Sequence, residues 1–431
     1  MHESRSSLDT APALPVSPPQ HGHVPQPTTA QGRPGDPPLT VALLTGADDR
    51  NYAHDLALSL ARRGLSVDFI GSDDVRAPEH GAIRFLNLRG SQSTQAPPPA
   101  KVFRILRYYA RLLAYAWTAG PPVFHILWNN KFEAFDRTLL MLWYRLAGRR
   151  VVLTAHNVNA ARRDGRDSAW NRLTLRVQYR LAERVFVHTE AMRRELEHAF
   201  GVPATKVSVI PFATPDVTPS TDLTREEARE RLGIPPQDKV LLFFGQIVPY
   251  KGLEFMLQAL PALLAADPDY RLLIAGKVKR GHEAYWKGLQ ESLLAPVAQR
   301  ADARIGHIAE HEVEHYFRAA DALVLPYVEI YQSGVLFLSY RFGLPVVATD
   351  VGDFRNNVLA GRTGHVCAAR DAQALSRCIA EHFASGLQGD PAAARRAILE
   401  HARRHHSWSE VAAITERAYR SVRPGLRPHE A

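Results

Sequence analysis

Short apolar runs of strand length recur along this chain, and stretches with helical periodicity separate most of them. Runs of this kind are typical of strands buried on both faces, and their alternation with helices predicts parallel, doubly wound α/β sheets. A chain of 431 residues is long enough for two or three domains with their own cores. We predict strands at 39–44, 66–70, 83–88, 123–127, 151–154, 185–187 and 207–210, and then at 240–244, 271–275, 322–325 and 346–348.

The alternation is interrupted near residues 211–236, where a Thr/Pro/Asp-rich segment precedes a short helix and a Gly-Ile-Pro-Pro turn. We therefore predict two Rossmann-like domains facing a cleft, at 39–212 and 213–405. The segment 406–431 contains a helix that we expect to cross back onto the first domain. Residues 1–38 are rich in Pro, Ser, Gln and Gly and lack large apolar residues, so we predict that they are disordered.

Composition excludes several classes of protein. The two cysteines are too few for a disulfide framework or a zinc site, so a reducing compartment is expected. We find no apolar run of about 18 residues and no signal-peptide pattern.

Residues 101–184 hold 16 Lys and Arg against 5 Asp and Glu, an excess larger than the +9 of the whole chain. This basic region predicts an anionic partner, and the alternative is a merely soluble arginine-rich surface.

The segment 326–352 carries the strongest chemical signal. A polar loop follows the strand at 322–325, and a helix begins at about Ser333. The backbone N–H groups near Ser333 and Gly334 would then lie at the carboxyl end of a parallel sheet, where a helix N-terminus attracts phosphate. Lys251 follows the end of another strand, so a helix N-terminus and a lysine could together bind a diphosphate. The alternatives are an ordinary N-cap for Ser333 and a solvated side chain for Lys251.

Several motifs from residue 40 onward resemble the GT4 family of retaining glycosyltransferases, which have the GT-B fold. The most specific are Gly245…Pro249-Tyr250-Lys251-Gly252, the strand-loop-helix at 329–339, and Phe342-Gly343-Leu344-Pro345 with the Val351-Gly352 turn. The Gln-Ser-Gly-Val version of the donor loop is similar to a bacterial surface and exopolysaccharide branch of that family.

The resemblance implies a nucleotide-sugar donor held by the second domain, with no cofactor and no metal, so that fixed cations and amides neutralise the leaving diphosphate. It implies a catalytic or phosphate-contacting role for His156, for which a structural histidine is the alternative. Glu329 would hold the donor sugar, or is a plain loop carboxylate. The implied donor-binding residues are Gly245, Gln246, Lys251, Ser333, Gly334, Val335 and Gly352. The base is expected near the backbone of 306–309.

The chain departs from the family pattern at several positions. Gln246 stands where the family commonly has an arginine, and Leu338 stands where an acidic residue holds the donor ribose. A strict alignment puts Ile330, rather than Glu329, at the sugar-binding acid. Asn356 replaces a further acidic residue. These departures make a nucleotide-sugar-binding protein without transferase activity an open alternative.

Residues 101–117 form a helical pattern in which Arg104, Arg107 and Arg111 share one face beside aromatic and aliphatic residues. Such a stripe suits an anionic membrane surface, and a core helix with a solvated arginine face is the alternative. With Gly46 in the first strand-to-helix turn, these arginines are our acceptor and membrane candidates. Because the aromatic residues lie in an apolar helical pattern, we do not expect a nucleic-acid partner.

We therefore expect a glycosyltransferase that is peripherally bound to the inner face of the bacterial cytoplasmic membrane. It would transfer a hexose from a nucleotide-sugar to a polyprenyl-linked saccharide in envelope or exopolysaccharide synthesis. The alternative acceptor is a soluble molecule.

Overall fold

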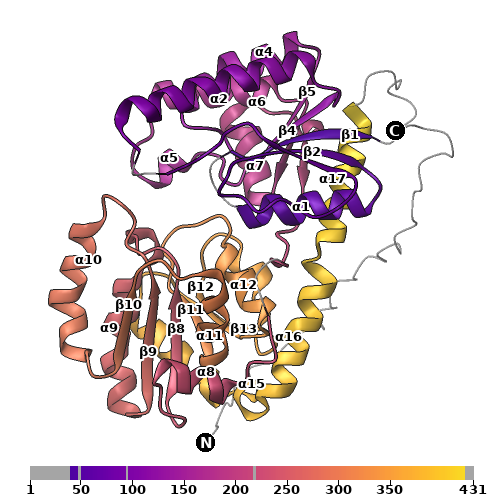
Figure 1. The fold of residues 1–431 in the computed structure, drawn as a ribbon. Coiled ribbons are helices and arrows are strands. Elements are labelled where there is room, and N and C mark those ends of the chain that lie inside the picture. Colours follow the sequence, from indigo (N-terminus) through magenta and orange to yellow (C-terminus); the bar gives the residue numbers. More distant parts are fainter. Residues whose placement is uncertain (1–38, 47–49, 94–95, 217–219, 423–431) are drawn as a thin grey trace, which may run out of the picture. The chain divides into compact units, whose positions relative to one another are not determined.

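The computed structural model describes residues 39–46, 50–93, 96–216 and 220–422. The predicted disordered segment 1–38 lies outside the described residues. The chain forms two parallel sheets, each covered by helices (Figure 1). Together with the return of the last helix to the first sheet, this confirms the predicted fold class. The domain limits at residues 212 and 405 remain predictions.

The first sheet has the strand order β3-β2-β1-β4-β5-β6-β7, and all of its pairs are parallel. Its strands are β1 (Thr40–Leu44), β2 (Ser66–Gly71), β3 (Ile83–Asn87), β4 (Val123–Ile126), β5 (Arg150–Thr154), β6 (Arg184–Val187) and β7 (Val207–Val209). Its helices are α1 (Arg50–Arg62), α2 (Pro98–Thr118), α3 (Glu133–Phe135), the π-turn η1 (Asp136–Leu140), α4 (Met141–Leu146), α5 (Ala160–Arg163), α6 (Ala169–Leu181), α7 (Glu190–Phe200) and the 3₁₀ turn η2 (Ala204–Lys206).

The second sheet has the order β10-β9-β8-β11-β12-β13, again all parallel. Its strands are β8 (Lys239–Phe244), β9 (Tyr270–Gly276), β10 (Ala301–Ile305), β11 (Ala322–Leu325), β12 (Val346–Thr349) and β13 (Gly364–Cys367). Its helical elements are α8 (Arg225–Leu232), η3 (Pro249–Lys251), α9 (Leu253–Ala266), α10 (Glu283–Leu289), η4 (Gln290–Leu294), η5 (Ala295–Val297), α11 (Glu310–Ala319), α12 (Gly334–Arg341), α13 (Phe354–Asn357), α14 (Ala372–Ala384), α15 (Gly386–Gly389) and α16 (Pro391–His405).

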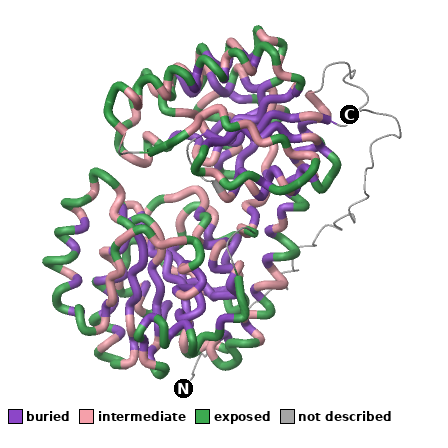
Figure 2. Tube along the Cα trace, viewed as in Figure 1, coloured by how far each residue is buried: buried purple, intermediate pink, exposed green. Residues whose placement is uncertain are grey.

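The inner strands of both sheets are buried on both faces (Figure 2), and their alternate residues point into two different cores. In β1, Ala42 and Leu44 join the core under α2, α4, α6 and α7, whereas Val41 and Leu43 join the core under α1 and α17. In β8, Val240 and Leu242 alternate in the same way with Leu241 and Phe243. The continuous apolar runs in the sequence follow from this two-sided burial.

The last helix, α17 (Trp408–Val422), packs on the first domain. Glu416 accepts a hydrogen bond at 2.7 Å from Nε of Arg63, the residue that follows α1. The Tyr419 hydroxyl lies 2.6 Å from His125 Nδ1 in β4, inside the core of the first sheet. No helix in the described part of the chain is long and apolar enough to cross a bilayer.

Candidate active site

Strand order reverses beside β1 in the first sheet and beside β8 in the second, and ligands of such sheets bind at the carboxyl ends of the strands where this happens. A cavity of about 420 Å³ lies at these ends and is lined from both domains. The first domain contributes Asn51, Tyr52, Asp55, Asn157 and Arg163, and the second contributes Tyr250, Lys251, Tyr327, Ser333, Gly334, Val335 and Leu338, among others. We call this cavity the donor pocket.

Lys251 is the central cation of the donor pocket. It ends the turn η3, where Gly252 has a φ of +65°, and only 7% of the residue is exposed. Its Nζ lies 3.5 Å from the Phe244 carbonyl oxygen and 5.2 Å from the centre of the Tyr327 ring. No carboxylate of the described residues forms an ion pair with it, although a buried ammonium is stable only with a partner. The alternative of a solvated lysine is wrong, and the arrangement favours an anionic ligand.

Gly245 leaves room for that ammonium. A Cβ at Gly245 would lie 2.8 Å from Lys251 Nζ, and the φ of +108° also favours glycine. The predicted neighbour Gln246 is different, because it is exposed and does not line the donor pocket.

Ser333 precedes the first residue of α12 but does not cap it. The helix has no side-chain N-cap, and the buried Ser333 hydroxyl lies 3.4 Å from the Tyr327 hydroxyl instead. The N-cap alternative is therefore wrong. Because no side chain caps α12, the N–H groups of Gly334 and Val335 are available to an anion in the donor pocket, whereas the Leu336 N–H donates to the Ser333 carbonyl oxygen at 3.1 Å.

His156 lies at the carboxyl end of β5 as expected, but it does not line the donor pocket. Its ring stacks on Trp128 at 4.2 Å and meets the edge of Tyr52 at 4.8 Å. Its Nδ1 lies 3.1 Å from His188 Nε2. Burial lowers the pKa of His156 well below its usual range and lowers that of His188 to about 4, so both rings are neutral at pH 7.

The Nε2 atom of His156 is buried and has no hydrogen-bond partner among the described residues. Tyr52 contacts the His156 ring, Asn157 follows His156 in the sequence, and both line the donor pocket. His156 thus lies beside the donor pocket, in contact with one of its lining residues.

Other predicted residues lie outside the donor pocket. Glu329 is exposed, and Gly352 has a φ of +57° at a turn where a Cβ would overlap the Ile330 carbonyl oxygen. Asn356 donates to Asp353 at 2.6 Å. Neither these residues nor the backbone of 306–309 lines the donor pocket.

The acceptor and membrane candidates differ in their exposure and in their hydrogen bonds. Gly46, at φ +62°, accepts a hydrogen bond from Arg89 through its carbonyl oxygen. Arg104 is half-buried and donates to the Ser93 carbonyl oxygen at 3.1 Å, whereas Arg107 and Arg111 are exposed on α2. Arg104 lines a second cavity of about 440 Å³, whose other basic lining residues are Arg89, Lys101, Lys131 and Arg280, with no acidic residue among its lining residues.

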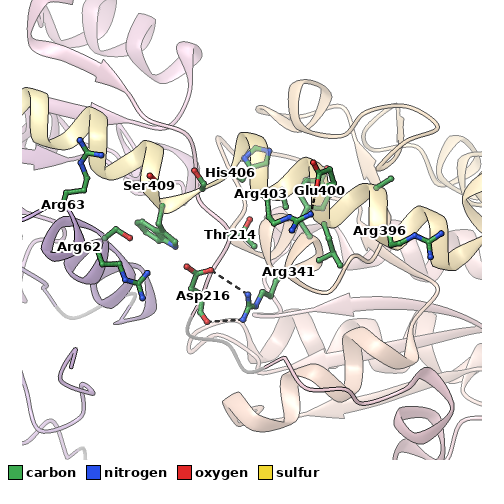
Figure 3. A pocket seen from close by; sticks show the side chains of 17 residues that line it. Arg62, Arg63, Thr214, Asp216, Arg341, Arg396, Glu400, Arg403, His406 and Ser409 are labelled. Atoms are coloured by element: carbon green, nitrogen blue, oxygen red, sulfur yellow. Dashed lines mark hydrogen bonds and ion pairs between the residues drawn. The ribbon is translucent and has the colours of Figure 1, made fainter. Parts of the chain in front are cut away.

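A larger cavity of about 1140 Å³ lies where α16 gives way to α17 (Figure 3). Arg341 points at Asp216 there, with 3.8 Å between Nη1 and Oδ1. Trp408 lines both this cavity and the donor pocket, so it is a wall between the two. This cavity could not be predicted, because its lining residues come from distant parts of the chain.

The site also contains Tyr52 and Tyr327, which were not predicted as site residues. Tyr327 could have been found, because it follows β11 by two residues. Arg163 was predicted only among the arginines of 145–184, as an extension of the basic surface or a contact for a pyrophosphate-bearing lipid acceptor, and not as a donor residue. Among the described residues, no group of three or more His, Cys, Asp or Glu is placed to hold a metal ion.

Comparison with known protein families gives one match in each of the two domains. The sequence model described as "Glycosyltransferase Family 4" matches residues 50–213, and that described as "Glycosyl transferases group 1" matches residues 238–385. A D-inositol 3-phosphate glycosyltransferase of Corynebacterium urealyticum is 27% identical over 404 residues, which cover 86% of this chain and 90% of that protein.

Other relatives match over a shorter length. A lipopolysaccharide core biosynthesis mannosyltransferase of Rhizobium meliloti is 33% identical over 154 residues, which cover 35% of this chain and 43% of the relative. Among solved structures, a sucrose-phosphate synthase of Thermosynechococcus elongatus has a TM-score of 0.68 at 19% identity, over 89% of this chain and 99% of the other. Anabaena HepE in complex with UDP and glucose has a TM-score of 0.67 at 16% identity, over 89% of this chain and all of that chain. At these identities the solved structures show the fold.

Proposed function

Since the chain is a GT4-like glycosyltransferase with the GT-B fold, we propose that it transfers a sugar from a nucleotide-sugar to a lipid-linked saccharide in envelope or exopolysaccharide synthesis. The observation that carries the donor half of this proposal is Lys251, a buried cation without a carboxylate partner, in one pocket with the uncapped N-terminus of α12. A diphosphate supplies the negative charge that this arrangement lacks.

We propose retention of configuration without a metal. As the bond from the anomeric carbon to the leaving phosphate oxygen breaks, Lys251 and the amides of Gly334 and Val335 receive the developing charge. The acceptor hydroxyl forms the new bond on the same face and passes its proton to the departing phosphate. A neutral His156 could then accept or donate a hydrogen bond at the reacting sugar through Nε2, whereas Glu329 stays a candidate for the sugar hydroxyls.

The membrane half rests on the surface of the first domain. Of the large apolar residues that are exposed in the described chain, all but Ile305 come from a region that includes α2, η1, α4 and α6. On α2 these are Val102, Phe103, Leu106 and Trp117, beside the exposed Arg107 and Arg111. Apolar and basic side chains together suit an anionic bilayer, so we place the protein peripherally at the inner face of the bacterial cytoplasmic membrane.

A soluble acceptor is the second candidate. The cavity around Arg104 has only basic charged residues in its lining, and several relatives are named for a phosphorylated inositol. This alternative predicts that the activity of the wild type does not depend on lipid vesicles. The activity of the variant Arg104→Glu with Arg107→Glu should then not depend on them either.

The donor proposal is tested by thermal unfolding with UDP, GDP, ADP and their sugars. One nucleotide should stabilise the wild type, by about 2.7 kcal/mol at a concentration one hundred times its Kd. Lys251→Ala should lose this stabilisation, whereas Lys287→Ala on the exposed side of α10 should keep it. If no nucleotide stabilises the wild type, or if both variants respond as the wild type does, the proposal is wrong.

A further inference from the structure

The second domain supplies little positive charge to the donor pocket. Lys251 is its only cationic lining residue in the described chain, and Gln246 is uncharged, exposed and not among the lining residues. A leaving nucleoside diphosphate carries more than one negative charge at neutral pH. One ammonium and a helix N-terminus therefore leave part of that charge without a fixed counter-charge.

Arg163 is the other cation that lines the donor pocket, and it comes from the first domain. It ends α5, a short helix whose N-cap Asn159 accepts from the Arg162 backbone N–H. The Arg163 side chain is 12% exposed. Its guanidinium carbon lies 4.3 Å from the centre of the Tyr250 ring.

Fixed partners hold one edge of this guanidinium. Nε donates to Asp164 Oδ1 at 2.8 Å, and Nη1 lies 3.5 Å from Asn157 Oδ1. In the described chain, Nη2 makes no hydrogen bond to the protein. An arginine held in this way presents its remaining N–H groups without losing further rotamer freedom.

Asp164 does not cancel the charge of Arg163, because it is shared. Arg166 Nη2 lies 3.4 Å from its Oδ2, and Lys279 Nζ of the second domain lies 3.7 Å from the same atom. Three cations surround one carboxylate, and hydrogen bonding to Arg163 lowers the pKa of Asp164 against the opposing effect of burial. The cluster keeps a net positive charge.

Two tyrosines connect Arg163 to Lys251. Arg163 lies over Tyr250, the residue before Lys251. The Tyr250 ring meets the edge of Tyr327 at 6.4 Å, and Lys251 Nζ faces Tyr327 at 5.2 Å. The two cations thus flank one aromatic wall of the pocket.

We propose that Arg163 is the second cation on the donor diphosphate, supplied by the opposite domain in place of a charge at position 246. This inference rests on the proposed function. As the bond from the sugar to the phosphate oxygen breaks, Lys251 and Arg163 share the charge of the leaving diphosphate, while the acceptor oxygen bonds to the anomeric carbon and its proton goes to the leaving phosphate. Donor binding then joins the two domains through one ligand.

The test compares diphosphate with monophosphate binding by calorimetry. The pairs are UDP and UMP, GDP and GMP, and ADP and AMP, measured for the wild type, Arg163→Ala, Arg163→Lys and Lys251→Ala. Arg166→Ala is the matched control, because it contacts the same Asp164 but is 77% exposed and does not line the pocket. Circular dichroism and thermal midpoints confirm that each variant folds.

We expect Arg163→Ala to weaken diphosphate binding about tenfold or more while leaving monophosphate binding within twofold of the wild type, because one charge-assisted contact has been lost. Arg163→Lys should restore part of the difference, and Arg166→Ala should behave as the wild type. If Lys251→Ala loses diphosphate affinity and Arg163→Ala does not, the inference is wrong while the proposed function stands. If the wild type binds no diphosphate more tightly than its monophosphate, both fail.

Discussion

At the scale of single residues, Gly252 fixes the position of Lys251. A Cβ at Gly252 would overlap the Pro326 carbonyl oxygen, and its φ of +65° is unfavourable for other residues. We expect Gly252→Ala to displace η3, to weaken nucleotide binding at least tenfold, and to lower the thermal midpoint. Gly281→Ala is the control, because Gly281 also has a positive φ of +88° but open space around it. If both substitutions weaken nucleotide binding equally, backbone strain rather than the overlap with Pro326 would explain the loss of affinity.

Buried histidines should make the fold sensitive to acid. Burial lowers the pKa of His125 to about 3 and those of His188 and His382 to about 4, from 6.5. The unfolded chain binds protons below pH 6.5 and the folded chain does not, so stability falls as the pH drops from 6.5 towards 4. Burial also lowers the pKa of His406 to about 4 and that of His156 well below 6.5, so Asp136, whose pKa is raised to about 6 by burial, opposes this trend only in part.

The histidine prediction is checked with His125→Gln. Between pH 6.5 and pH 5 one such histidine costs about 1.6 kcal/mol of stability, so the variant should lose that much less over this interval than the wild type. Chemical denaturation at both pH values measures the difference. His80→Gln, at an exposed position, should follow the wild type. A variant whose pH dependence equals that of the wild type would contradict the assignment.

The sequence was informative about residues whose position follows from strand ends. Lys251 and Ser333 could be placed near a phosphate site because each follows a predicted strand in a parallel sheet. The contact of Tyr52 with His156 could not be predicted, because it depends on how α1 packs against Trp408 and Trp128. Arg163 was predicted as part of the basic surface, and its place in the donor pocket could not be predicted, since only the fold brings it to Tyr250.

At the scale of elements, α2 has two faces with different tasks. Tyr108, Tyr109, Leu112 and Ala116 pack on the first sheet, which leaves the exposed apolar residues and arginines on the outer side. We expect Phe103→Ser with Arg107→Glu and Arg111→Glu to reduce binding to phosphatidylglycerol vesicles at least tenfold in co-sedimentation. Each basic residue near such a surface contributes about 1 kcal/mol.

The control for the α2 variant is Arg403→Glu with Arg404→Glu, exposed on α16. Like the α2 variant, this control makes the net charge more negative, but it leaves the apolar residues of the first domain intact. A loss of vesicle binding in this control, or its retention in the α2 variant, would argue against membrane docking through α2.

Prediction of the strands succeeded throughout the first sheet, including its outer strands β3 and β7, and failed only at the edges of the second sheet. The strands β10 and β13 were missed, and they are the two outer strands of the second sheet. Their sequences, Ala-Asp-Ala-Arg-Ile and Gly-His-Val-Cys, lack a continuous apolar run because edge strands are only partly covered. The inner strands β8, β9, β11 and β12 were all predicted within a few residues of their bounds.

At the scale of the whole molecule, the first domain depends on the last helix. Ala412 of α17 is fully buried in the core beneath α1. We expect Ala412→Asp to destabilise the first domain by about 3 kcal/mol or more, because it buries an unpaired charge. Hydrogen exchange should show faster exchange in β1 and β2, far away in the sequence. Arg417→Asp, at an exposed position of the same helix, should leave those amides protected.

The return of α17 also has a consequence for biosynthesis. The core on one side of the first sheet contains Trp408, Val411 and Tyr419, which the ribosome adds only after the whole second domain. Domains of other proteins usually fold in the order in which they are made. Here the first domain is made before α17, so the apolar surface of β1 and α1 that α17 covers stays exposed while the second domain is translated. A chaperone that binds nascent chains would find its target on that surface.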